Sequence, residues 1–551
     1  MIDSPISFFV FFTLLVSVAF GKNLIHENNN CVKTILFLPL DERFTTYRAF
    51  LNLAETTPYC ILSPPENLLP SLKKSADLES IHQWVDENVA KADAMIFSAE
   101  MFLYGGLIAS RISNDSTAVI AERVEKLLSY PVKYPNLDIY VSNVVMRIPS
   151  YNGDFEEPWY WANYGADLFT YSFYLDKFNQ LNNTEDYQTA MSAIANVPQS
   201  AVEEFTWRRG RNHNITMMLL QQMTKSRPFH YFYTTLDDNA EYGFNIREAD
   251  EITSYINNPA SKLDASVCPV YPGADEVQLV MLARYAVNEV NGANKPVRLT
   301  TIFRDPANVN AIPSYEGQPM INTLTQQIFA SGGKLLDSTE DGDMILLVNN
   351  FSGEYQAEAS QQPSSGSIEN YDMFTPFITK ALSKQQVIGF CDNRYANGAD
   401  RYFVDYMIDQ TASYHFAINT YAGWNTDGNT IGTVVANTIL LHLFHQSEAN
   451  AKFNSLRLLE DNNYQADHRQ FLVSYVNQIT NTNESTSNLL PDLSFYERFA
   501  FKILSSRYDE IATTFSLPFQ LQSIYYPWNR TFEIGFYLEN ISHQHKVSLN
   551  E

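Results

Sequence analysis

Short apolar runs that end directly in polar residues recur along this chain, and this pattern constrains the fold more than any other feature. The run 231–236, for example, is followed at once by Asp237, Asp238 and Asn239. Other runs of this kind span residues 35–40, 94–97, 139–146, 299–303, 345–348, 387–390 and 416–418, and a shorter one ends at Val270. Buried parallel strands read as short hydrophobic runs, and ligands of α/β folds bind at their carboxyl ends. The pattern therefore predicts an α/β protein with a polar site along one edge of its strands.

Helical patterns separate these runs, so strand and helix alternate from residue 35 to about residue 445. The predicted helices span residues 77–91, 116–128, 201–225, 275–290, 321–331 and 399–410. Such alternation predicts a mainly parallel sheet with right-handed crossovers. We expect a (β/α)8 TIM-like barrel, although the nine strand candidates exceed the eight that a closed barrel needs. An open doubly wound sheet is the alternative, and it would bind ligands at the same edge.

Two regions depart from this alternation. Residues 150–200 are rich in Tyr, Trp, Asn and Glu, which predicts either a long inserted loop region over the ligand edge or the aromatic core of a small subdomain. From about Ser447 the pattern changes to helices and then to the alternation typical of strands. We therefore divide the chain into a signal peptide (1–21), a catalytic barrel-like domain (22–446) and a C-terminal α+β appendage (447–551) without evident site chemistry.

The amino terminus predicts the secretory route. Residues 8–20 form an apolar stretch that is too short to span a membrane comfortably, and a small-residue cleavage pattern follows near Gly21. No later run has the length of a membrane helix. We therefore expect no stable membrane span, and a secreted protein or one in a lysosomal or vacuolar lumen. Of seven N-x-S/T sequons we exclude Asn350, at a strand end, and predict glycosylation at Asn114, Asn182, Asn214, Asn483, Asn529 and Asn540.

Composition and motifs exclude several classes of protein. The formal net charge of -25 argues against nucleic-acid and anionic-membrane partners, because both need clusters of Lys and Arg. The chain has no G-x-S-x-G elbow, no P-loop and no dinucleotide-binding G-x-G-x-x-G after the first strand. His442 and His445 share a helix face without nearby acids. We expect no cofactor and no metal, although a rim lined by Asp would suit Ca²⁺ or Mg²⁺.

The four cysteines are too few for a disulfide scaffold in a chain of this length. Cys31 and Cys60 flank the first strand unit and could form a disulfide. Cys268 and Cys391 occupy strand positions, where we expect buried thiols rather than nucleophiles.

Asp237 and Asp238 are the strongest candidates for catalysis. Two adjacent carboxylates at a strand end cannot both ionise freely, so the pKa of one rises and that group can act as a general acid. Asp275 and Glu276 form a second acidic pair after the next strand. The alternative for such residues is capping of the following helix, which fits Asp275 best because a helical pattern starts directly after it.

Polar residues after other strands are candidates for binding the hydroxyl groups of a sugar. Trp424 and Asn425 lie in a loop with a glycine, where the ring could stack on a pyranose and the amide could bond its hydroxyls. The alternative for Trp424 is a packed side chain at the mouth of the fold. The remaining predicted binding residues are Asp41, Arg43, Arg147, Asn239, Tyr242, Asp392, Asn397 and Asp400. For Asp41 and Arg43 a structural ion pair is the alternative.

Several of these stretches together resemble the domain of unknown function 4127 family. The motifs that carry the resemblance are LPLDER (38–43), YGGL (104–107), SR (110–111), MR (146–147), DD (237–238), YG (242–243), YPGADE (271–276), NGAD (397–400), AGWNT (422–426) and PWNRTFE (527–533). They span nearly the whole mature chain. The resemblance implies membership of that family and brings no activity with it.

A looser resemblance bears on activity. Hexosaminidase barrels that use the substrate's 2-acetamido group as nucleophile carry an acidic pair after the fourth strand, as Asp237 and Asp238 follow the fourth main run here. By that resemblance Asp237 would orient the acetamido group, and Asp238 would protonate the leaving oxygen and later deprotonate water. Our hypothesis is a glycoside hydrolase acting on glycans, with N-acetylhexosaminides as one substrate class. Two-carboxylate hydrolysis by Asp238 with Asp275 or Glu276 is a variant, and a non-catalytic carbohydrate-binding protein on a barrel scaffold is the alternative.

Overall fold

The computed structural model describes residues 31–337, 341–363, 371–411, 419–480, 490 and 492–541. The predicted signal peptide (1–21), the apolar run 416–418 and the sequon at Asn483 lie outside these ranges. None of the helices in the described ranges is long and apolar enough to cross a membrane.

The first of two large sheets contains six parallel strands in the order β2-β1-β3-β4-β5-β6. In chain order the strands are β1 (Lys33–Leu38), β2 (Tyr59–Leu62), β3 (Ala94–Ser98), β4 (Asp138–Val145), β5 (Tyr231–Leu236) and β6 (Val270–Pro272). The central strands β3 and β4 are buried along nearly their whole length, as expected for a parallel sheet covered on both faces. We call this sheet and its helices the first module.

The second sheet contains five parallel strands in the order β13-β11-β9-β7-β8. In chain order they are β7 (Val297–Phe303), β8 (Gly333–Leu336), β9 (Met344–Asn350), β11 (Val387–Asn393) and β13 (Asn419–Ala422). Counted within each sheet, both follow the order second, first, third, fourth, fifth, and the first sheet adds a sixth strand. This second module therefore repeats the doubly wound topology of the first, although the sequence contains no visible repeat.

The α/β class and the parallel pairing agree with the sequence, but the closed (β/α)8 barrel is not confirmed. β2 and β6 are free edges of the first sheet, and β13 and β8 are free edges of the second. A buried strand reads the same in sequence whether its sheet closes or stays open, because closure depends on pairing between distant strands. The additional edge strands β2 and β8 are only partly buried and four residues long, so their sequence signal is weak.

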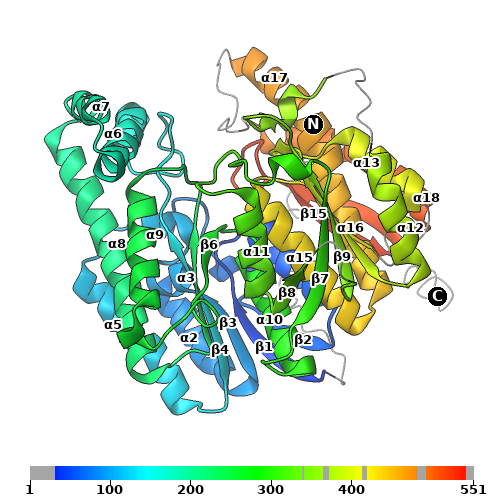
Figure 1. The fold of residues 1–551 in the computed structure, drawn as a ribbon, viewed down its shortest axis with the longest axis horizontal. Helices are drawn as coiled ribbons and strands as arrows, with labels where there is room; N and C mark the ends of the chain where they lie inside the picture. Colours follow the sequence, from blue (N-terminus) through cyan, green and yellow to red (C-terminus); the bar gives the residue numbers. More distant parts are fainter. Residues whose placement is uncertain are drawn as a thin grey trace, which may run out of the picture.

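Two buried helices join the modules (Figure 1). α10 (Val277–Asn291) packs on the first sheet, α15 (Asp427–Phe444) packs on the second, and the two helices pack against each other. Both are buried around nearly their whole circumference, as expected for helices enclosed on all sides. A glycine permits this close approach, because a Cβ on Gly432 of α15 would lie 2.4 Å from Cγ of Glu276. The modules consequently share one continuous apolar core.

Other helices cover the outer faces of the two sheets or their ends. They are α1 (Ala49–Ala54), α2 (Leu78–Asn88), α3 (Ala99–Tyr104), α4 (Leu107–Ile112), α5 (Thr117–Lys133), α9 (Phe244–Asn257), α11 (Met320–Ala330), α12 (Thr375–Ser383) and α13 (Arg401–Thr411). All six predicted helices are present, within a few residues of the predicted ends.

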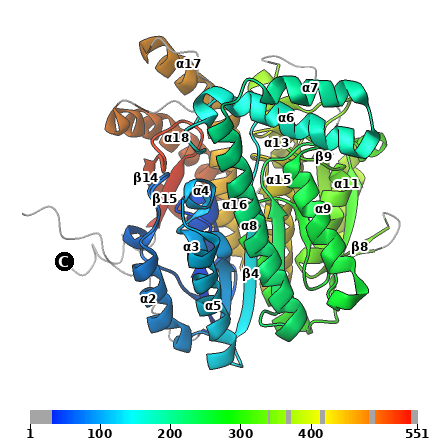
Figure 2. The same ribbon diagram turned by 90° about the vertical axis from the view of Figure 1, so that its left-hand side faces the viewer.

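The region 150–200 forms a loop and then two helices, α6 (Trp161–Leu181) and α7 (Thr184–Ile194), before α8 (Gln199–Ser226) leads back to β5. Figure 2 shows α6 and α7 across one end of the molecule, with α8 and α9 running down from them. Tyr160, Trp161, Phe205 and Phe244 form a separate small core there. The aromatic residues thus build a subdomain, while the preceding loop reaches the pocket described below.

The C-terminal region contains α16 (Ser447–Arg457), the π-helix η9 (Leu458–His468), α17 (Arg469–Thr480), α18 (Leu493–Phe515) and the antiparallel pair β14 (Phe519–Tyr525) and β15 (Gly535–Asn540). Its apolar side chains share a core with β9, β11 and α13 of the second module. A further short parallel pair, β10 (Ala357–Glu358) and β12 (Tyr395–Ala396), lies within the second module.

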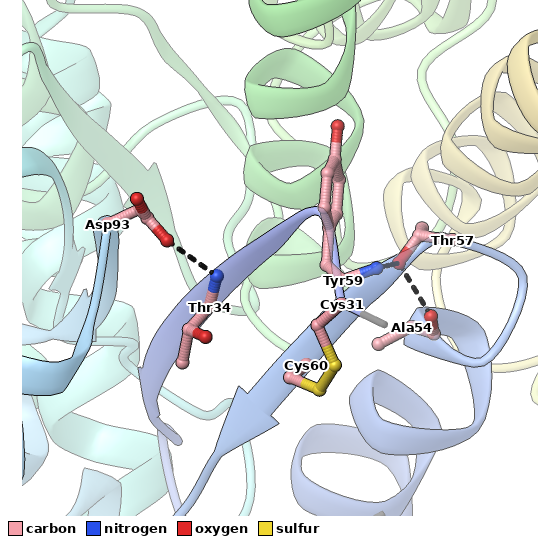
Figure 3. Close-up of a disulfide and its surroundings, with 7 residues drawn as sticks. All are labelled: Cys31, Thr34, Ala54, Thr57, Tyr59, Cys60 and Asp93. Carbon is pink, nitrogen blue, oxygen red and sulfur yellow. Dashed lines mark hydrogen bonds between the residues drawn. A yellow bond between two sulfur atoms is a disulfide. The ribbon is translucent and has the colours of Figure 1, made fainter. Parts of the chain in front are cut away.

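Cys31 and Cys60 form a disulfide between the start of β1 and the edge strand β2, with their Cα atoms 5.6 Å apart (Figure 3). Cys268 and Cys391 are buried thiols. Among the predicted glycosylation sites, Asn114, Asn182, Asn214 and Asn529 are exposed and Asn540 is half-buried, whereas the excluded Asn350 is fully buried.

Candidate functional site

One pocket gathers side chains from the carboxyl ends of both sheets. Residues that follow β1, β4, β5 and β6 line it from the first module, and loops of the second module line it from the other side. It offers about 130 Å³ to the centres of water-sized molecules, well above the ~10–15 Å³ that one water needs. The predicted residues that line it are Arg43, Arg147, Asp237, Asp238, Asn239, Asp275, Asn397 and Asn425.

Arg43, directly after β1, joins two of the predicted acids. It donates from Nη2 to Oδ2 of Asp41 at 2.7 Å, and from both terminal nitrogens to Asp275 at 2.6 and 3.2 Å. Trp528 lies against its flat face, 4.7 Å from the guanidinium carbon to the ring centroid. Asp41 therefore supports Arg43 from behind the pocket, as in the ion-pair alternative. Asp275 points at Arg43 and does not cap α10.

Arg111 and Arg147 hold the predicted catalytic pair. Arg111 contacts Asp237, and Arg147 donates to Oδ2 of Asp238 at 2.8 Å. Both guanidinium groups also contact Glu157, at 3.2 and 2.8 Å. The Asp238 backbone N–H donates to Oδ1 of Asp237 at 2.9 Å. Since every charge in this buried cluster has an opposite charge beside it, attraction offsets part of the cost of removing the ions from water.

The C-terminal region completes the pocket. Arg530, in the connection between β14 and β15, contacts Glu156 from the loop before α6, and Glu156 also contacts Arg111 and Arg147 at 3.1 and 3.2 Å. Phe532 lines the same pocket. The appendage to which the sequence assigned no chemistry therefore supplies a cation and an aromatic ring to the site.

Asp238 is the most accessible of the acids in this ion-pair network. Its side chain is 31% exposed, compared with 9% for Asp237 and 5% for Asp275. Burial raises the pKa of Asp238, Arg147 opposes the shift, and the neighbouring Asp237 adds to it. Burial also raises the pKa of Asp275 to about 7 against the opposing charge of Arg43. Asp238 is thus the acid of this network that is most open to the pocket.

Tyr315 faces the pocket from the second module with a strained backbone. Its φ is 67°, a left-handed conformation that is unusual for a bulky residue and that clusters at functional sites. Its hydroxyl donates to Glu358 at 2.7 Å, and Glu358 also accepts from Asn397 at 2.9 Å. The Asn239 N–H of the first module donates to the Tyr315 carbonyl at 2.8 Å. The ring is 42% exposed at the rim of the pocket, where it could contact a ligand.

Three acids at the junction of the modules are held by uncharged partners. Glu276 accepts from Ala274 N–H at 3.1 Å and from Gln327 at 2.9 Å. Glu316, which lines the pocket, accepts from the N–H of Gly428, and Asp427 accepts from a side-chain amide. Burial raises the pKa of Glu276 to about 8 and that of Glu316 well above its usual range, with Asp427 adding to the second shift. Within the described ranges, no ion pair involves these three carboxyls.

Several predicted site residues lie away from the pocket. Glu276 faces Gln327 behind it, and Tyr242 packs edge-on against Phe173 at 5.4 Å. Trp424 is 4% exposed with its ring 5.9 Å from that of Phe532, so the packed alternative describes it and no sugar can stack on its face. Asp392 and Asp400 are buried in the second module and both accept from Asn349, at 2.9 and 3.2 Å. These two acids stabilise the end of β11 and do not contact the pocket.

The sequence analysis missed several lining residues as site candidates, namely Arg111, Tyr151, Glu156, Tyr315, Glu316, Thr426, Asn429, Arg530 and Phe532. Most of them do not follow an apolar run. A signal was available for Arg111, Arg530 and Phe532, because the motifs SR (110–111) and PWNRTFE (527–533) belong to the family resemblance. In the part of the chain that is described, no group of three or more His, Cys, Asp or Glu residues is arranged to hold a metal ion.

The fold and the pocket define a class: an α/β protein with two doubly wound modules and a charged pocket where their strand ends meet. The chain belongs to the family described as "Protein of unknown function (DUF4127)", which matches residues 35–537. The matched range therefore covers both the Asp41–Arg43 pair near the amino terminus and Arg530 near the carboxyl terminus. No curated protein matches the chain. No solved structure matches it either.

Proposed function

We propose that this protein is a glycoside hydrolase that binds a glycan in the pocket and cleaves a glycosidic bond beside Asp238. The accessibility of Asp238 carries this proposal, because an acid–base group must come within hydrogen-bond distance of its substrate. The raised pKa of Asp238, caused mainly by burial, favours a carboxyl that can donate a proton in mildly acidic solution. The amides that surround it suit sugar hydroxyl groups.

Substrate-assisted hydrolysis of an N-acetylhexosaminide is the version we favour. Asp237 would orient and polarise the acetamido group, and Asp238 would protonate the leaving oxygen. The contacts support this division of roles, since Asp237 is fixed by Arg111 and by the backbone N–H of Asp238, while Asp238 is more exposed. In the two-carboxylate variant, Asp275 would act opposite Asp238. Glu276 does not line the pocket, so we do not propose a role for it in the reaction.

A non-catalytic carbohydrate-binding protein is the second candidate, and one observation favours it. Each of Asp237, Asp238 and Asp275 pairs with an arginine. An arginine partner favours the ionised form of a carboxyl and fixes its position, which suits recognition of hydroxyl groups better than proton transfer.

We also propose that the protein acts outside the cytosol, in the secreted space or in a lysosomal or vacuolar lumen. The Cys31–Cys60 disulfide and the exposed sequons at Asn114, Asn182, Asn214 and Asn529 support this location. Deglycosylation by an N-glycosidase should lower the mass of the purified protein, and an unchanged mass would contradict use of these sequons.

The deciding experiment compares wild type with Asp238→Asn on nitrophenyl glycosides, with and without 2-acetamido groups, between about pH 4 and about pH 7. Asp409→Asn, at an exposed position of α13, is the matched control. We expect Asp238→Asn to lower turnover by about 10²–10⁴-fold with binding retained, and the control to behave as wild type. Release from acetamido substrates alone supports substrate assistance, and release from plain glycosides discards that mechanism. Saturable binding without any turnover supports the binding protein.

A further inference from the structure

Every arginine around the pocket is paired, and the carboxylates in these pairs outnumber the arginines. Four arginines line it, and each contacts at least one carboxylate: Arg43 with Asp275, Arg111 with Asp237, Arg147 with Asp238, and Arg530 with Glu156. The four guanidinium groups are nearly completely buried, with side-chain exposures between 1% and 9%. No guanidinium group in the lining is therefore left to balance the charge of an anionic ligand.

This pairing penalises anionic ligands. An anionic group would reach an arginine only by displacing the carboxylate that holds it. The displaced carboxylate would then be a buried charge without its partner, which is among the most costly changes in a protein interior. The pocket therefore disfavours an anionic ligand.

The same pocket holds hydrogen-bond acceptors without donors. The side-chain oxygens of Asn239, Asn397 and Asn429 are buried, and none has a hydrogen-bond partner among the described residues. Asn239 follows β5 in the first module, Asn397 follows β12, and Asn429 lies in the first turn of α15. A buried acceptor without a partner is unfavourable, so each of these oxygens is stabilised by a ligand that donates to it. Nε of Arg111 is a buried donor that likewise has no hydrogen-bond partner among the described residues.

We infer that the pocket selects an uncharged, polyhydroxylated ring, a neutral pyranose, whose hydroxyl groups donate to Asn239, Asn397 and Asn429. Uronic acids, sialic acids and phosphorylated sugars are excluded by the paired arginines. This inference rests on the proposed function insofar as the ligand is a sugar, but it concerns binding and does not require hydrolysis. Acceptors from both modules would contact one ring, so the ligand also bridges them.

Pairs of neutral and anionic sugars test whether the pocket disfavours anionic ligands. Binding of methyl 1-thioglycosides of glucose, galactose and N-acetylglucosamine to the wild-type chain is measured by calorimetry and compared with glucuronic and galacturonic thioglycosides. These differ only in carrying a carboxylate for a CH2OH group. We expect saturable binding of at least one neutral ligand and at least tenfold weaker binding of its charged partner. Equal or tighter binding of a uronide would overturn the inference, and so would the absence of saturable binding by every neutral ligand.

Two variants sharpen the test. Asp238→Asn removes the negative charge of the most exposed carboxylate in the network, so the preference for the neutral over the anionic ligand should shrink several-fold. Asn429→Ala should weaken neutral binding about five- to tenfold, whereas Asn322→Ala, at an exposed position of α11, should not. An unchanged preference in Asp238→Asn, with folding verified by thermal denaturation, would contradict the charge argument. If the protein cleaved only uronides, this inference would be wrong and the proposed hydrolase activity would stand. If it bound neutral sugars without cleaving any, the inference would stand and the proposed hydrolase activity would be wrong.

Discussion

The two modules share a strand order but present different chemistry to the pocket. The first module contributes Arg43, Arg147, Asp237, Asp238 and Asp275, all directly after its strands and all charged. The second contributes mainly amides and hydroxyl groups from its loops, in Tyr315, Asn397, Asn425, Thr426 and Asn429, with the single acid Glu316. The acids that end its strand β11 are turned into its own interior. One topology therefore places residues at a rim without deciding their role, which is consistent with function being carried by sites and not by folds.

The two sides also hold their acids differently. Those of the first module are paired with arginines, whereas Glu276, Glu316 and Asp427 at the junction accept hydrogen bonds from amides and backbone N–H groups. This contrast gives measurable differences in stability, in pH dependence and in tolerance to substitution.

Breaking the arginine network should have the largest effect. Arg111→Met leaves the buried Asp237 without its arginine and removes one of the two arginines that Glu156 and Glu157 share, so we expect a loss of about 3–5 kcal/mol in the free energy of unfolding. Urea denaturation measures it. Arg401→Met, which breaks a half-exposed pair with Asp467 in the second module, should cost about 0–1 kcal/mol. Equal losses in the two variants would remove the distinction between the network and a surface pair.

The junction acids should make stability depend on pH. The pKa of Glu276 rises from 4.5 to about 8 on folding, mainly through burial, so the unfolded chain loses its proton first. The stability that protonated Glu276 contributes to the folded state is fully present below about pH 4.5 and is lost as the pH rises towards 8. At about 1.4 kcal/mol per pKa unit, the loss is on the order of 5 kcal/mol. Glu276→Gln should flatten the decline of unfolding free energy over this range, and Glu122→Gln, at an exposed position of α5, should leave it unchanged. A decline as steep in Glu276→Gln as in wild type would assign it to other groups.

The disulfide distinguishes one edge of the first module from the corresponding edge of the second. Cys31 and Cys60 tie β1 to β2 across 29 residues of sequence, whereas the two thiols among the described cysteines, Cys268 and Cys391, are free. Replacing Cys31 and Cys60 by Ser should lower the free energy of unfolding by about 2–4 kcal/mol, because the unfolded chain regains the freedom of an open loop. Dithiothreitol should lower the melting temperature of wild type and leave that of the variant unchanged. Equal sensitivity of both proteins to dithiothreitol would show that the disulfide does not contribute to stability.

The smallest expected change concerns strain at Tyr315. Tyr315→Gly relieves a left-handed backbone conformation but removes the hydrogen bond to Glu358, so these effects should cancel to within about 1 kcal/mol of unfolding free energy. Ligand affinity should nevertheless fall at least tenfold, because the ring at the rim is lost. Tyr315→Phe, which keeps the ring, should bind nearly as well as wild type. A large loss of stability in Tyr315→Gly would instead give the tyrosine a structural role.

The strand runs and their trailing residues could be predicted because both are local. Eight of the fourteen predicted site residues, including Arg43, Asp237, Asp238 and Asp275, line the pocket, and each follows a strand. Arg111, Glu156 and Arg530 could not be assigned in this way, because they lie in a short helix, an insertion loop and a terminal hairpin connection. For Trp424 the sequence predicted the loop and left sugar stacking and packing open, and the contact with Phe532 favours packing.

The sequence by itself determined the α/β class, the parallel strands, most helices and the family, since each depends on short periodic patterns or on contiguous motifs. Only the tertiary structure decided that the strands form two open sheets in place of one barrel, and which arginine lies beside which carboxylate. Both depend on contacts between residues far apart in the chain, such as Arg530 with Glu156. Local patterns contain no information on such pairings, because the same apolar run and the same charge are compatible with many partners.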